Sequence, residues 1–124
     1  MSPYLDVTVI PVPRAKLDLY KKMSAEWGQA HLRHGAMYFS DAVGDDVQPG
    51  KLTSFPQALQ LQDGEVVAVS WVVYASKADR DRIAAAVRED PQLKEQMAAA
   101  EMPFDGKRMF WGGFQTIIGL AAGH

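Results

Sequence analysis

The sequence predicts a single α+β domain in which helices pack on one face of a mainly antiparallel sheet. Residues 65–75 are apolar at successive positions, which is typical of a strand covered on both faces. Residues 14–34 carry apolar side chains at three- and four-residue steps, the pattern of an amphipathic helix. Turn signals separate these segments, and nearly half of the 124 residues are apolar, which suffices for one core.

The first half of the chain is predicted to form a strand, a helix and a second strand. Residues 4–12 are rich in Val and Ile and end at two prolines, so they favour a strand. The helix of residues 14–34 is followed by Gly35, which suits a left-handed cap. The second strand spans residues 36–43. Alternate residues of the first strand share a face: on one side Leu5, Val7 and Val9, and on the other Tyr4, Asp6, Thr8 and Ile10.

The second half repeats the strand and helix pattern. Residues 52–62 are expected to form a bent extra strand, interrupted at Pro56, before the hairpin signal Asp63-Gly64 and the strand 65–75. Ser76 opens a helix to residue 89, and Asp90-Pro91 restarts it as far as about residue 100. Residues 107–118 are predicted to be the last strand of a domain that spans residues 1–118. The tail 119–124 has no pattern and is expected to be flexible.

This order of elements is βαββαβ, a ferredoxin-like arrangement with an inserted strand or extended hairpin. Both helical segments then cover one face of the sheet and leave the other face bare. Trp71 or Ser70, and Tyr4 or Asp6, are expected to line the bare face. Because an apolar face of this size is unstable in water, we expect a homodimer in which two sheets face each other, a dimeric α+β barrel.

Several motifs resemble the YbaA-like family of bacterial proteins. They are Tyr4-Leu-Asp6, Asp45-Asp46 with Pro49-Gly-Lys51, Ser70-Trp71 with Tyr74, Asp90-Pro91, and Met102-Pro-Phe-Asp-Gly-Lys-Arg-Met109 followed by Gly112-Gly-Phe114. Val7 and Trp111 depart from the pattern, in places where a small residue and a tyrosine are expected. The resemblance covers nearly the whole chain and implies a ferredoxin-like protomer and a homodimer of the dimeric α+β barrel superfamily. It implies no established activity, because this family carries a domain of unknown function.

Composition argues against several classes of partner. The formal net charge of −2 provides no basic field for nucleic acid. The chain has no cysteine, no run of apolar residues long enough to span a bilayer, and no visible signal peptide, so we expect a cytoplasmic protein that is not bound to a membrane. His31 and His34 are three residues apart, but a third metal ligand is not evident. We therefore expect neither a metal site nor a cofactor.

Two residues are candidates for acid–base chemistry. Asp6 is the only charged residue inside the first strand. It either acts as a general base in a dimer cavity, or pairs with Arg108 or Lys107 and fixes the strand. His31 is either an acid–base group that lines a pocket or a hydrogen-bonded histidine at the boundary between helix and sheet.

Aromatic residues and one cation are the candidates for ligand contacts. Each aromatic residue is either part of the core or interface or part of a pocket wall. The candidates are Trp27, Tyr38, Trp71, Tyr74 and Arg108. By contrast, Asp41, Asp45 and Asp46 are expected to form a solvated turn, because they lack the spacing of a calcium loop.

The sequence leaves two hypotheses for function and does not decide whether the protein is an enzyme. The first is a protein that binds a small apolar or aromatic metabolite, with or without cofactor-independent chemistry. Members of the α+β barrel superfamily include cofactor-free oxygenases, isomerases and haem-degrading enzymes, although a shared fold is weak evidence for a shared reaction. The second is a dimeric interaction or regulatory module without chemistry.

Overall fold

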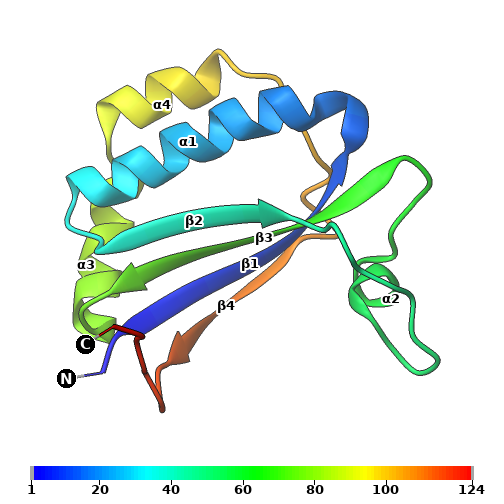
Figure 1. Ribbon diagram of the computed structural model, residues 1–124. Helices are drawn as coiled ribbons and strands as arrows, with labels where there is room; N and C mark the ends of the chain where they lie inside the picture. The colour runs from blue at the N-terminus through cyan, green and yellow to red at the C-terminus, as the bar shows by residue number, and fades with distance from the viewer. Residues whose placement is uncertain (1, 124) are drawn as a thin grey trace.

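Four antiparallel strands form one twisted sheet in the computed structural model, which describes residues 2–123 (Figure 1). The order across the sheet is β2-β3-β1-β4, so the N-terminal strand lies in the interior and pairs with β3 and β4. This is the order of a ferredoxin-like βαββαβ fold, as predicted. The strands are β1 (Tyr4–Pro13), β2 (Tyr38–Val43), β3 (Glu65–Tyr74) and β4 (Phe110–Gln115).

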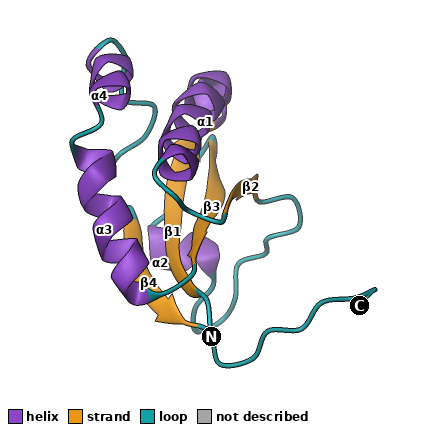
Figure 2. Cartoon of the chain, turned by 90° about the vertical axis from the view of Figure 1, so that its left-hand side faces the viewer, coloured by secondary structure: helices purple, strands orange, loops and turns teal. Residues whose placement is uncertain are grey.

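Three helices cover one face of this sheet (Figure 2). After a 3-10 turn, η1 (Arg14–Lys16), α1 (Leu17–Arg33) runs along the sheet and ends before Gly35, whose φ of 113° is the left-handed conformation expected there. The hydroxyl of Ser76 accepts a hydrogen bond from the Asp79 amide and begins α3 (Lys77–Arg88). The carboxylate of Asp90 accepts a hydrogen bond from the Leu93 amide in the same way and begins α4 (Pro91–Ala98). The predicted break between these two helices is confirmed.

The segment between β2 and β3 is a short helix and not the predicted extra strand. The Ser54 hydroxyl accepts a hydrogen bond from the Gln57 amide and starts α2 (Phe55–Leu59). Pro56 lies in the first turn, where its missing N–H is tolerated, so it supports a helix and does not interrupt a strand. Leu59 is fully buried against Val9 and Val67, and α2 therefore covers one end of the sheet face that the other helices leave open.

The last strand is shorter than predicted at both ends. It spans residues 110–115, whereas the sequence predicted 107–118. Lys107 and Arg108 belong to a turn in which both amides donate to Asp105, one to its side chain and one to its carbonyl. This turn uses the backbone donors that a longer β4 would have directed to β1. Residues 116–123 form no helix or strand, and residue 124 of the predicted tail lies outside the described residues.

The register of the four strands fixes which side chains share a face. Asp41, Ser70, Thr8 and Trp111 form one row across the sheet on the face below α1, α3 and α4. Tyr4 and Asp6 also lie on this helix-covered face, so the expectation that one of them lines the bare face is wrong. The opposite face, called the open face below, carries Leu5, Val7, Tyr38, Trp71, Val73 and Phe114.

Two glycines allow close packing at the edges of this layer. A side chain at Gly28 of α1 would overlap the ring of Phe39 in β2. A side chain at Gly113 of β4 would overlap the phenol of Tyr4, so this glycine makes room for a side chain of the neighbouring strand β1. Within residues 2–123, no helix is long and apolar enough to cross a membrane.

Candidate functional site

A cavity of about 620 Å³ lies between the sheet and the helices that cover it. Two buried clusters flank it within the same layer: one includes Val72, Tyr74, Ile83 and Val87, and the other includes Ile10, Val12, Tyr20 and Ala68. A second hollow of about 350 Å³ adjoins the cavity and shares Asp6, Ala84, Arg88 and Trp111 with it. The layer between helices and sheet is therefore packed at its ends and open in its middle.

Small polar side chains on the sheet explain why the layer does not close. Thr8 and Ser70 lie side by side in the row that forms the floor of the cavity, where Val or Ile would have filled the space. Both residues are half-buried, so their hydroxyls can donate hydrogen bonds to an occupant of the cavity and accept them from it. A floor of hydroxyls under apolar walls is the usual composition of a small-molecule site.

Asp41 belongs to this cavity and not to the solvated turn predicted for it. Its Oδ2 accepts hydrogen bonds from the hydroxyls of Tyr20 and Ser24 on α1, each at 2.6 Å. Its Oδ1 is buried and has no hydrogen-bond partner among residues 2–123. Burial raises the pKa of Asp41 above its ordinary value, although the two hydroxyl donors act in the opposite direction. Asp45 and Asp46 are exposed, as predicted.

His31 lines the cavity from α1 and is only 4% exposed. Its Nδ1 lies 2.8 Å from the carbonyl oxygen of Trp27, so Nδ1 carries the hydrogen and donates it. The hydrogen bonds among the described residues leave Nε2, on the opposite side of the ring, free to accept. Burial lowers the pKa of His31, which favours the neutral imidazole at neutral pH.

We expect His31 to titrate below its ordinary pKa of 6.5. Because the folded-state pKa is the lower one, the unfolded chain binds the proton first, and the contribution of neutral His31 to stability is lost as the pH falls from 6.5 toward the folded-state pKa. Proton–nitrogen NMR of the imidazole across this range measures the shift. The urea stability of His31→Gln should depend less on pH over the same range, and a His31 pKa at or above 6.5 would contradict the assignment.

Asp6 faces the cavity from β1, and both of its oxygens are engaged. Oδ1 accepts from the Arg80 guanidinium at 2.7 Å, and Oδ2 accepts from the Tyr74 hydroxyl at 3.0 Å. The predicted ion pair therefore exists, but its partner is Arg80 of α3 and not Arg108 or Lys107. The site also differs from the one we predicted, because Asp6 lies in a cavity within one protomer and not on a face turned toward a second one.

The structure brings together four of the seven predicted site residues. Asp6, Trp27, His31 and Tyr74 all line the cavity. Trp71 and Tyr38 lie on the open face, since each is one position out of step with the residues that face the helices. Arg108 is bound elsewhere: its guanidinium makes two contacts with the Glu65 carboxylate, one of 2.7 Å, and lowers the pKa of that group.

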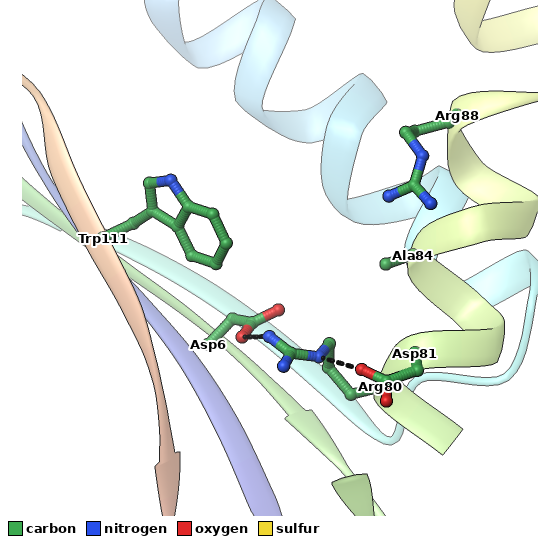
Figure 3. A pocket seen from close by; sticks show the side chains of 6 residues that line it. All are labelled: Asp6, Arg80, Asp81, Ala84, Arg88 and Trp111. Atoms are coloured by element: carbon green, nitrogen blue, oxygen red, sulfur yellow. Dashed lines mark hydrogen bonds and ion pairs between the residues drawn. The ribbon is translucent and has the colours of Figure 1, made fainter. Parts of the chain in front are cut away.

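Several cavity residues were not predicted. Four of the six methionines line it, namely Met23, Met97, Met102 and Met109. Methionine is flexible and polarizable, so such walls adapt to the shape of an occupant. Arg88 was also missed as a wall residue. Figure 3 shows Arg88 and Trp111, an aromatic residue that the sequence allows either in the core or in a pocket wall, pointing into the same space from α3 and β4. The sequence signal for the cavity face was the alternation of Asp6, Thr8 and Ile10 along β1, since all three side chains line the cavity.

The described part of the chain contains no group of three or more His, Asp or Glu residues arranged to hold a metal ion. His31 and His34 illustrate why. His31 is bound to the backbone of its own helix, whereas the Nε2 of His34 lies 2.7 Å from Asp90. Arg33 also contacts Asp90, and this cluster joins the end of α1 to the start of α4.

Solved structures with the same fold share little sequence with this chain. A dimeric ferredoxin-like protein from an uncultured marine organism matches with a TM-score of 0.58 at 10% identity, and covers 97% of this chain and 100% of its own. The protein Rv0793 from Mycobacterium tuberculosis matches with a TM-score of 0.52 at 11% identity, again over 97% of this chain and 100% of its own. Both support the fold alone.

Sequence comparison identifies nearer relatives. The protein YbaA of Escherichia coli K12, which is described as uncharacterised, is 39% identical over 115 residues, or 93% of this chain and 97% of YbaA. The YbaA protein of Shigella flexneri matches equally well. Residues 3–106 match the model of a family described as a protein of unknown function, DUF1428. On these grounds, and with the fold above, the chain belongs to the DUF1428 family.

Proposed function

We propose that the protein binds a small, largely apolar molecule in the cavity between the sheet and the helices. The observation that carries this proposal is the open middle of an otherwise packed layer, about 620 Å³ in volume, with Thr8 and Ser70 on its floor. A cavity of this size lies within the range of small-molecule sites. The side chains that line it lack the dispersion contacts that a bound molecule would provide.

His31 supports a directed interaction with such a molecule. Its Nε2 is the nitrogen available to the cavity, and its neutral state makes it a hydrogen-bond acceptor and a proton acceptor. Asp6 is less suited to accept a proton, because Arg80 and Tyr74 already occupy its two oxygens. If the bound molecule reacts, we therefore infer a cofactor-independent proton transfer at His31, with Asp6 holding Tyr74 and Arg80 in the wall.

We also propose that the protein is a homodimer whose two open faces pack together. Two aromatic side chains of the open face are exposed in the single chain, Tyr38 at 54% and Phe114 at 57%, and the aliphatic residues and Trp71 beside them are half-buried. Helix α2 covers only the end of this face at Val9 and Val67. The dimeric ferredoxin-like proteins that share this fold support the same assembly by analogy.

A thermal-shift screen of a metabolite library tests the binding proposal. A ligand at a hundredfold excess over its Kd should stabilise the fold by about 2.7 kcal/mol and raise Tm by about 5 to 10 °C. Ala84→Trp fills the cavity from α3 and should abolish the shift. Ala85→Trp, one residue further along the same helix and exposed, is the matched control and should leave the shift intact. A shift that survives Ala84→Trp would place the ligand elsewhere.

A further inference from the structure

We propose that the ligand of this cavity is an organic anion, an apolar or aromatic molecule with one carboxylate-like group, and that Arg88 binds that group while Trp111 stacks on the body. This inference rests on the binding function proposed above and specifies its ligand class. Two observations carry it: a guanidinium without a partner at the mouth of the cavity, and an exposed indole on the opposite wall.

Arg88 is an arginine for which the protein supplies no anion. Among residues 2–123 it makes no ion pair and no side-chain hydrogen bond, whereas the neighbouring arginines Arg80 and Arg82 are both paired with aspartates. Its guanidinium points into the hollow that adjoins the cavity (Figure 3). A guanidinium presents two parallel N–H donors that match the two oxygens of a carboxylate.

The other charged groups around Arg88 are already matched. Asp6 and Asp81 are both bound to Arg80, and Glu89 is bound to Lys94 at 3.1 Å. Asp81 is also seven residues before Arg88 on α3, which places it about 10 Å further along the helix. The formal charges lining this hollow sum to zero, so the lining itself adds no net positive charge that would attract anions at long range. The hollow offers one unpaired donor group, the Arg88 guanidinium, which suits a ligand with one anionic group.

Trp111 provides the second contact. It lies on the edge strand β4 with 63% of its surface exposed, although it points inward over the hollow and not away from the protein (Figure 3). The single cation–π contact found among the described residues is that of Arg80 over Tyr4, so the indole and Arg88 are not stacked on each other. A flat apolar body fits between these two walls and covers the indole face.

A matched pair of probes separates the anion from the apolar body. The probes are 8-anilinonaphthalene-1-sulfonate and N-phenyl-1-naphthylamine, which share one ring system and differ by the anionic group. Arg88→Gln should weaken the sulfonate probe about tenfold and change the neutral probe by less than about twofold. Arg82→Gln removes the same charge from the exposed side of α3 and should change neither. Arg88→Lys should restore part of the loss. Fluorescence titration measures all four proteins.

The outcomes distinguish the two proposals. If Ala84→Trp abolishes binding of the neutral probe but Arg88→Gln leaves the sulfonate probe unaffected, the cavity binds apolar molecules and the assignment of Arg88 is overturned. Equal weakening of both probes by Arg88→Gln also overturns it, because the effect is then not on the anion. If the wild-type protein binds neither probe, or if Ala84→Trp changes neither, the binding function fails and the ligand class fails with it.

Discussion

Replacing Arg80 by methionine should lower the free energy of unfolding by about 2 to 3 kcal/mol. The Arg80 and Asp6 side chains are only 16% and 17% exposed, and the substitution leaves the Asp6 carboxylate with Tyr74 as its remaining donor. Methionine keeps much of the aliphatic packing but loses the contact of the guanidinium with the Tyr4 ring, now 5.0 Å from its centroid. Urea denaturation at fixed protein concentration measures the change.

The control for this experiment is Arg82→Met on the same helix. The Arg82 side chain is 61% exposed and its aspartate lies 3.6 Å away, so its loss should change stability by less than about 0.5 kcal/mol. The double variant Arg80→Met with Asp6→Leu removes both charges and should recover part of the loss, since an uncompensated charge is worse than none. Equal effects of Arg80→Met and Arg82→Met would show that the pair between α3 and β1 contributes little.

Leu5→Glu should convert the proposed dimer into a monomer. Leu5 lies in the row of the open face that also contains Val73, Tyr38 and Phe114, and the two-fold axis would bring two such glutamates into one apolar interface. We expect the dissociation constant of the dimer to rise at least about a thousandfold, or ~4 kcal/mol. Size-exclusion chromatography with light scattering measures the mass of the wild-type and variant proteins.

Leu32→Glu is the matched control for Leu5→Glu. Leu32 lies on α1, is 48% exposed, and is not part of the open face. Leu32→Glu also replaces a leucine by a glutamate, but outside the open face, so the variant should remain a dimer. A wild-type protein that runs as a monomer at micromolar concentration would refute the assembly, and a Leu5→Glu protein that remains dimeric would refute this interface.

The alternation of side chains predicted the two faces of β1 but not which face the helices cover. Leu5, Val7 and Val9 were correctly grouped apart from Asp6 and Thr8. A period of two shows only that two sets of side chains exist, and each set here contains apolar residues that could belong to a core. The choice depends on how the sheet packs on α1 and α3, which no local pattern specifies.

The partner of Asp6 could not be read from neighbouring strands alone. Arg108 was a reasonable candidate because β4 lies beside β1. The register pairs Asp6 with Gly113, however, whereas Arg108 lies in the turn before β4 and contacts Glu65. Glu65 pairs with Pro13, and the seven residues of β1 between Asp6 and Pro13 correspond to about 24 Å. Arg80 is close because β3 ends next to the start of β1 and α3 begins immediately after it.

The order of strands also bears on how the chain reaches this structure. β1 is synthesised first, yet its partners are β3, about 60 residues later, and β4, which begins at Phe110. Such pairings between distant segments are slow to form, and until β4 emerges β1 has a free edge rich in Val and Ile. A chain shortened before Phe110 would keep that edge unpaired and should aggregate. Pairing of β4 with β1 is therefore the step that protects a newly synthesised chain from aggregation through this edge.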